Sequence, residues 1–177
     1  MDWRVVVSGA TPREIRGNRR RALASGEDRE EYLGFVIDRE FYAVSLALVR
    51  EILKPPPVTE VPRSPPDVLG IVSVRGQITT VLDLRLRLGA GAAPQTLHSR
   101  VLLVQGNDEV LGLLVDEVTQ VYRLAPAEIE STSSVLGNNV GSHVAGIGRP
   151  RVRGLRNEQH SSDDEVLILL DLASLLG

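Results

Sequence analysis

The sequence predicts a mostly β protein that contains two copies of one β unit, with short helices and an N-terminal helical extension. Apolar side chains occur in runs of strand length, and turn residues separate these runs. Aromatic residues make up only 3% of the chain, so we expect a core of branched aliphatic side chains, which suit pleated sheets. The segment "VLDLRLRLG" at 81–89 also recurs as "LLDLASLLG" at 169–177, which indicates an internal repeat.

Residues 1–30 differ from the rest and are predicted to be a basic extension to a domain at 31–177. The segment Thr11-Pro12-Arg13-Glu14 has the pattern of a capped helix start, and a short helix to about Leu23 should follow it. Residues 1–23 carry six arginines and two carboxylates, about +4, so a net charge of −3 leaves about −7 for the remainder.

Nine strands are expected in the main domain. Three predicted turns contain residues that tolerate a positive φ or bond their own backbone, namely Asp38-Arg39, Arg75-Gly76 and Gly106-Asn107-Asp108, and these predict hairpins. The expected strands are Leu33–Ile37, Phe41–Leu46, Val49–Ile52, Ile71–Val74, Ile78–Leu84, Val101–Val104, Val110–Val115, Val118–Val121 and Val166–Leu170.

The repeat extends beyond its most similar segment. "EFYAV" and "VREI" at 40–52 match "EVLGL" and "VTQV" at 109–121 at a constant offset of 69, and Gly70-Ile71 matches Gly146-Ile147. We therefore expect two interleaved lobes, the first mainly 31–90 and the second mainly 99–170. Each lobe is too small to bury a large core alone, so the two should share an apolar seam.

The residues give no support for catalysis, a cofactor or a metal. The chain has no cysteine, and its three histidines lack the i, i+4 spacing of a helical metal site. No nucleophile elbow or nucleotide-binding motif occurs, and the Gly89–Pro94 segment follows a predicted helix, which is the wrong context for a phosphate loop. Asp83 and Asp171 are equivalent in the two copies, and we expect each to cap a short helix rather than act as an acid or base.

A cytoplasmic protein is expected, because no signal-peptide core or membrane-spanning run is found. The acidic main domain disfavours nucleic acid as its partner, since it repels phosphates. The surface is more informative. Val49-Arg50-Glu51-Ile52 is expected to be a strand whose residues point alternately in and out. It precedes Pro55-Pro56-Pro57, a proline run that blocks further pairing and leaves a strand open for recognition. An ordinary barrel strand is the alternative.

Three segments in this order resemble the CheW family, the receptor–kinase coupling proteins of bacterial chemotaxis. "YLGFVIDREFYAVSLALVREI" at 32–52 resembles the opening strands with their V-x-E-I segment. "LGIVSVRGQITTVLDLRLRLG" at 69–89 resembles the signature G-x-x-N-L-R-G-x-x-x-P-x-x-D-L, with Ser73 and Thr80 at its asparagine and proline positions. "VLGLLVDEVTQV" at 110–121 resembles a strand pair of the family. The resemblance covers about 145 residues.

The resemblance implies two packed SH3-like five-stranded β-barrels in a non-catalytic adaptor. Its partners would be the regulatory domain of a CheA-type histidine kinase and the cytoplasmic tip of a methyl-accepting chemoreceptor. The adaptor would be a monomer when free and would be recruited to receptor arrays at the inner membrane. Carried over by position, the kinase-binding residues are Val49, Glu51, Ile52, Gly70 and Arg75, and the receptor-binding groove contains Val101, Val118 and Val121. Arg75 would bond partner carboxylates or carbonyls, or else hold its own turn.

Two segments depart from the family pattern and leave alternatives open. The arginine-rich extension and a long insertion at 149–164 in the last hairpin are both outside the pattern. A CheW-like module that retains only one interface, in a motility or developmental pathway, is the second reading. A third reading makes residues 1–24 an arm for nucleic acid or anionic membrane.

Overall fold

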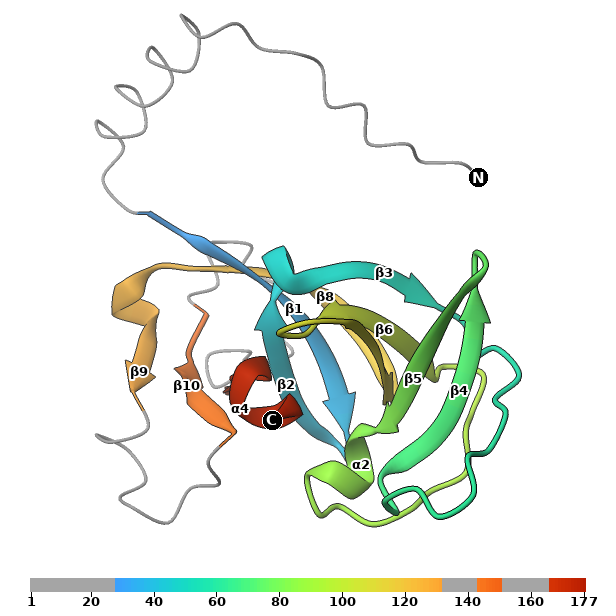
Figure 1. The fold of residues 1–177 in the computed structure, drawn as a ribbon. Helices are drawn as coiled ribbons and strands as arrows, with labels where there is room; N and C mark the ends of the chain where they lie inside the picture. The colour runs from blue at the N-terminus through green and yellow to red at the C-terminus, as the bar shows by residue number, and fades with distance from the viewer. Residues whose placement is uncertain (1–27, 132–142, 151–165) are drawn as a thin grey trace, which may run out of the picture.

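The computed structural model describes residues 28–131, 143–150 and 166–177, which form two β-sheets and a few short helical segments (Figure 1). The strands in chain order are β1 (Glu30–Ile37), β2 (Glu40–Ser45), β3 (Val49–Leu53), β4 (Val68–Val74), β5 (Gln77–Asp83), β6 (Arg100–Gln105), β7 (Val110–Val115), β8 (Glu117–Leu124), β9 (Ile129–Ser131), β10 (Val144–Gly148) and β11 (Leu167–Leu170). Two α-helices, α2 (Leu84–Arg87) and α4 (Leu172–Leu176), and two 3₁₀ turns, η1 (Leu46–Leu48) and η2 (Pro126–Glu128), complete the described elements. All nine predicted strands are confirmed. The predicted N-terminal helix and residues 151–164 of the predicted insertion lie outside the described residues.

The three predicted hairpins are confirmed. β1 pairs with β2 across Asp38-Arg39, β4 pairs with β5 across Arg75-Gly76, and β6 pairs with β7 across the turn at 106–109. Asp38 and Arg39 both have positive φ, 49° and 72°, as the tight two-residue turn requires.

The two sheets have equivalent topologies. The five-stranded sheet has the order β3-β6-β7-β5-β4, and the six-stranded sheet has the order β8-β1-β2-β11-β10-β9. The sequence repeat aligns these orders strand by strand, with β9 as the addition. The same repeat aligns the parallel pair β5–β7 with the parallel pair β11–β2. The internal duplication predicted from the sequence is therefore confirmed.

The sheets do not follow the lobe boundaries expected from the repeat. β1 and β2, at the start of the predicted first lobe (31–90), lie in the six-stranded sheet with β8 to β11. β6 and β7, at the start of the predicted second lobe (99–170), lie in the five-stranded sheet with β3 to β5. Each half thus gives its first hairpin to the sheet of the other half. The physical reason lies in these hairpins, because they carry unbroken apolar runs such as Val101–Val104, which need cover on both faces.

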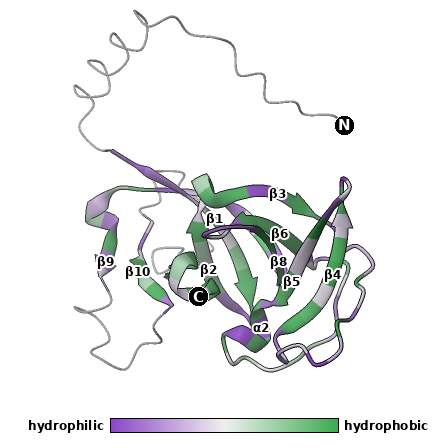
Figure 2. Ribbon diagram, viewed as in Figure 1, coloured by the Kyte–Doolittle hydropathy of each residue, from purple (hydrophilic) through white to green (hydrophobic). Residues whose placement is uncertain are grey.

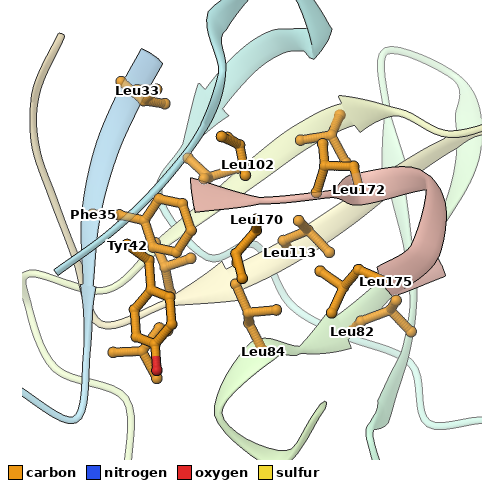
Figure 3. Packing of buried hydrophobic residues seen from close by; sticks show 14 of the residues in the cluster. Leu33, Phe35, Tyr42, Leu82, Leu84, Leu102, Leu113, Leu170, Leu172 and Leu175 are labelled. Carbon is orange, nitrogen blue, oxygen red and sulfur yellow. The ribbon is translucent and has the colours of Figure 1, made fainter. Parts of the chain in front are cut away.

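Alternating side chains of the exchanged hairpins divide the core into three parts. Leu102 and Val104 of β6 point into a large seam cluster between the sheets, while Val101 and Leu103 point into a smaller cluster inside the five-stranded sheet. A second small cluster, around Tyr122 and the neighbouring leucines, lies inside the six-stranded sheet. Figure 2 shows the apolar residues concentrated along the central strands, and Figure 3 shows the side chains that meet in the seam. The predicted shared seam is confirmed.

The seam cluster takes side chains from both halves of the chain. Its fifteen buried members come from β1, β2, β5, β6, β7, β11, α2 and α4. Phe35 and Tyr42 stack with ring centroids 6.2 Å apart, and they are the only aromatic pair found among the described residues. Leucine and valine supply most of the remainder, as the low aromatic content predicts.

The two predicted helix caps are confirmed. Asp83 accepts hydrogen bonds from the backbone N–H groups of Arg85 (2.9 Å) and Leu86 (3.3 Å) at the start of α2. Asp171 accepts from the N–H of Ala173 (3.0 Å) and from the hydroxyl of Ser174 (2.7 Å) at the start of α4. The Ser174 hydroxyl lowers the pKa of Asp171 most, and its backbone donors and nearby His143 act in the same direction.

Candidate docking surfaces

β3 is an edge strand of the five-stranded sheet, and its end lies close to the β4–β5 turn (Figure 1). An ion pair joins the two segments, with 2.8 Å between Arg75 Nη2 and Glu51 Oε1. The Arg75 side chain is 79% exposed and that of Glu51 is 32% exposed. The backbone of Arg75 has φ 52° and that of Gly76 has φ 81°, so the turn projects the guanidinium from the tip of the hairpin. This charged pair remains accessible to a partner.

Apolar side chains are exposed on the same elements. Ile52, on β3, is 43% exposed, and Ile78, two residues after the Arg75-Gly76 turn, is 69% exposed. Ile78 was not among the predicted site residues. Its outward position was not readable from the sequence, because the usual alternation of strands would bury apolar Ile78 and expose its polar neighbour Thr79, whereas the structure does the reverse. Exposed aliphatic side chains beside an accessible ion pair have the composition of a protein-docking surface.

Two of the predicted kinase-binding residues act mainly inside the fold. Gly70 is buried with φ 144°, and a Cβ there would lie 2.2 Å from the carbonyl oxygen of Thr59. Only glycine allows the backbone of Thr59 to pair with Ile71, through two hydrogen bonds of 2.9 Å. Val49 is half-buried and packs against the seam cluster. Gly70 and Val49 therefore hold the surface that Arg75, Glu51 and Ile52 present.

The predicted receptor-groove residues are also divided by burial. Val121 on β8 is 45% exposed, and Val118 is half-buried against the seam cluster. Val101 is only 1% exposed and packs in the small cluster inside the five-stranded sheet. This corrects the expectation that Val101 lines a groove, because its side chain has no access to a partner. The continuous apolar run of β6, Val101–Val104, is buried on both faces of its sheet.

Two residues of each predicted surface occupy equivalent positions in the duplicated unit. Val49 and Val118 match at the offset of 69, and both pack on the edge of the seam cluster. Ile52 and Val121 match at the same offset, with nearly equal exposed fractions of 43% and 45%. β3 and β8 are also equivalent edge strands of their sheets. The two predicted docking surfaces are thus the two copies of one structural feature, and each carries an ion pair, Arg75–Glu51 at the first copy and Arg123–Glu31 at the second.

Within the described residues, no group of three or more histidine and carboxylate side chains has the arrangement of a metal site. His143 lies with Nδ1 2.8 Å from the carbonyl oxygen of Ser174, and His160 lies outside the described residues. No helix in this part of the chain is both long and apolar enough to span a membrane.

Two equivalent sheets that share one core, with exposed aliphatic residues on equivalent edge strands, define a duplicated, mostly β domain. Comparison with known proteins identifies its family. The model of the CheW-like domain matches residues 31–177, and the chain belongs to this family. The mostly β fold with two SH3-like subdomains that the resemblance implied is confirmed.

Proteins named CheW from three bacteria are similar to this chain. The chain is 35% identical over 130 residues to the chemotaxis protein CheW of Helicobacter pylori, covering 72% of this chain and 78% of that protein. It is 30% identical over 117 residues to the chemotaxis protein CheW of Rhizobium meliloti, covering 66% and 76% respectively. The crystal structure of the scaffolding protein CheW from Thermoanaerobacter tengcongensis is similar with a TM-score of 0.69 at 26% identity, covering 84% of this chain and 92% of that one.

Proposed function

We propose that this protein is a non-catalytic scaffold that couples a CheA-type histidine kinase to methyl-accepting chemoreceptors. Membership of the CheW-like family and the names of the similar proteins support a role in chemotaxis signalling. The observation that carries the site assignment is the exposed Arg75–Glu51 ion pair beside Ile52 and Ile78. Information would pass through changes in contact between docked partners, which needs no catalytic group.

The kinase regulatory domain is proposed to bind the end of the five-stranded sheet that carries this ion pair. Ile52 and Ile78 would supply apolar area, and Arg75 would bond carboxylates or carbonyls of the partner in its fork geometry. Glu51 holds the guanidinium in place and would contribute to specificity more than to affinity. The receptor tip is proposed to bind at β8, where Val121 is exposed and Val118 supports it from the core edge.

The ion pair permits a test that separates the two roles of Arg75. Arg75→Glu should weaken kinase binding about tenfold, or about 1.4 kcal/mol, measured by titration calorimetry with the isolated regulatory domain. The double variant Glu51→Arg with Arg75→Glu restores an ion pair of reversed polarity. If Arg75 contacts the kinase, binding by the double variant stays weak. Recovery of full affinity would show that the pair only holds its own turn, and would contradict the proposed contact.

Arg123 offers a matched control. It forms an ion pair with Glu31 at 2.8 Å and its side chain is 72% exposed, but it lies on the six-stranded sheet. Arg123→Glu should leave kinase affinity unchanged.

Val121→Asp should weaken binding to a receptor-tip hairpin without affecting binding to the kinase. If Val121→Asp leaves receptor affinity unchanged, the assignment of β8 fails. Separate measurement of the two affinities also shows whether only one interface is retained.

A further inference from the structure

The chain passes between the two sheets at two places that are built very differently. The first crossing is η1, which leads from β2 in the six-stranded sheet to β3 in the five-stranded sheet. The second is the single residue Asp116, between β7 in the five-stranded sheet and β8 in the six-stranded sheet. Because the sheets have no other covalent connection in the described residues, these crossings and the seam determine how the sheets sit together.

The Asp116 crossing is held by a cluster of charged groups. Asp116 Oδ2 accepts hydrogen bonds from the backbone N–H of Asp38 at 2.9 Å and from Arg85 Nη1 at 2.5 Å. Arg85 Nη2 also lies 3.0 Å from Asp38 Oδ1, and Arg85 Nε donates to the carbonyl of Gly91 at 3.1 Å. The Arg85 side chain is only 15% exposed, so solvent screens these ion pairs less than typical surface pairs.

Arg85 and Arg87 both lie on α2, the four-residue helix that follows β5 of the five-stranded sheet. Figure 1 shows α2 beneath the junction of the two sheets. Arg87 donates to the carbonyl of Leu175 from Nε and Nη2 at 2.9 and 2.6 Å, and it pairs with Asp67 at 2.7 Å. Leu175 lies on α4, which follows the last strand of the six-stranded sheet. One short helix therefore reaches the other sheet with two arginines.

The second copy of the repeat lacks this device. Ala173 and Leu175 occupy the positions on α4 that Arg85 and Arg87 occupy on α2. The η1 crossing consists of Leu46, Ala47 and Leu48 and receives no side-chain cap from Ser45. None of its residues is fully buried, and only the partly buried Leu46 packs against the seam cluster. An open cavity lies against it, lined by residues 29–31 and 45–47.

We propose that α2 is a one-sided staple, whose arginines fix the two sheets at the Asp116 crossing while the sheets open and close at the η1 crossing. Opening there moves β3, with Ile52, relative to β8, with Val121. The staple thus sets the spacing between the two docking surfaces. This consequence rests on the proposed function, whereas the staple itself is a property of the free chain.

The absence of natural cysteine allows a direct measurement of this motion. Spin labels at Lys54→Cys and Gln120→Cys, both at exposed positions, report the distance between the sheets by pulsed electron resonance. Labels at Gln120→Cys and Ala145→Cys, both on the six-stranded sheet, report a distance within one sheet. Arg85→Gln should broaden and shift the distance distribution between the sheets, while the distribution within the six-stranded sheet stays unchanged.

A control variant separates the staple from a general loss of surface charge. Arg149→Gln breaks an ion pair with Glu130 at 3.0 Å that stays within the six-stranded sheet, so it should change neither distribution. Asp38→Asn removes one of the two carboxylates of Arg85 at a half-exposed position, and keeps the test possible if Arg85→Gln does not fold. An unchanged distribution between the sheets in a folded Arg85→Gln or Asp38→Asn chain overturns the proposal. Because no partner is present, this result is independent of whether the kinase or the receptor binds.

Discussion

Tyr42 connects the ionisation of one side chain to the packing of the seam. Its ring stacks on Phe35, and its hydroxyl donates to Glu40 Oε2 at 2.9 Å. Burial, the hydrogen bond to Glu40 and the charges of Glu40 and Asp38 together raise the pKa of Tyr42 from 10.0 to about 12, and burial is the largest of these causes. The phenol therefore stays protonated in the folded protein at a pH where it ionises in the unfolded chain.

This shift predicts a loss of stability in alkaline solution. The contribution of Tyr42 is fully present below pH 10.0, where the folded and unfolded chains are both protonated, and it is lost as the pH rises towards 12. Tyrosinate absorbance of the folded protein should accordingly appear near pH 12 for Tyr42. Tyr32, which is bonded to Glu30, has a pKa of about 12 for similar reasons. Glu40→Gln should lower the pKa of Tyr42 and leave that of Tyr32 in place; equal titration curves for the variant and the parent would contradict this cause.

At the residue scale, the accessible members of the proposed site came from the family resemblance and not from a local pattern. Arg75 and Glu51 were carried over by position, and both are accessible, one in a turn and one on an edge strand. The role of Gly70 depends on the approach of Thr59, which lies in a proline-rich loop with no strand pattern, so that contact was not readable from the sequence. The ion pair between Arg75 and Glu51 was likewise not predicted, because these residues are 24 positions apart in the sequence and no local pattern brings them together.

At the scale of elements, α2 and α4 are too short to be stable alone and depend on their caps. Asp83 is 6% exposed and accepts hydrogen bonds from two backbone N–H groups, whereas Asp171 is more exposed and accepts from the N–H of Ala173 and the hydroxyl of Ser174. Loss of a buried acceptor costs more than loss of an exposed one, because the orphaned donors have less access to water.

Alanine substitution of the two caps should therefore have unequal effects. We expect Asp83→Ala to lower the free energy of unfolding by about 2 kcal/mol and Asp171→Ala by about 1 kcal/mol, as measured by urea denaturation. Asparagine at either position keeps a side-chain acceptor and should retain most of the stability. Equal losses at the two positions would show that burial of Asp83 adds nothing to its capping role.

Strand patterns were well predicted, whereas the contacts between strands were not. Alternation and turn residues located each hairpin, because these signals are local. Two strands were missed. The three-residue β9 is too short to show a period, and the two glycines of β10 interrupt its apolar pattern. The sequence predicted that the lobes interleave but not which hairpins are exchanged, because pairing β1 with β8 or with a strand of its own half satisfies the same local pattern.

At the scale of the whole molecule, the exchange makes each half depend on the other. β1 pairs with β8 and β2 pairs with β11, so the hairpin at 30–45 is completed only by residues from the second half. The seam cluster likewise contains buried side chains from both halves. Neither half contains a complete sheet.

Cutting the chain between the halves should test this dependence. With a protease site placed in the exposed connector at 91–94, the cleaved halves should co-elute from a sizing column and separate only in denaturant. Fragments 1–89 and 90–177 produced separately should lack a cooperative thermal transition and regain it on mixing. A cooperative transition in either fragment alone would contradict the interdependence. The uncleaved chain carrying the same protease site is the control.

The pairing of β1 with β8 also constrains how the chain folds while it is being synthesised. The β1–β2 hairpin emerges early, but Glu117–Leu124 follows some 80 residues later, a delay of roughly 4–16 s at about 5–20 residues per second. During that interval the apolar β1–β2 hairpin lacks the strand β8 with which β1 pairs. The five-stranded sheet, whose strands all lie within residues 49–115, can form before β8 emerges, whereas the six-stranded sheet cannot. A nascent chain stalled before β8 should therefore bind chaperones through its β1–β2 hairpin.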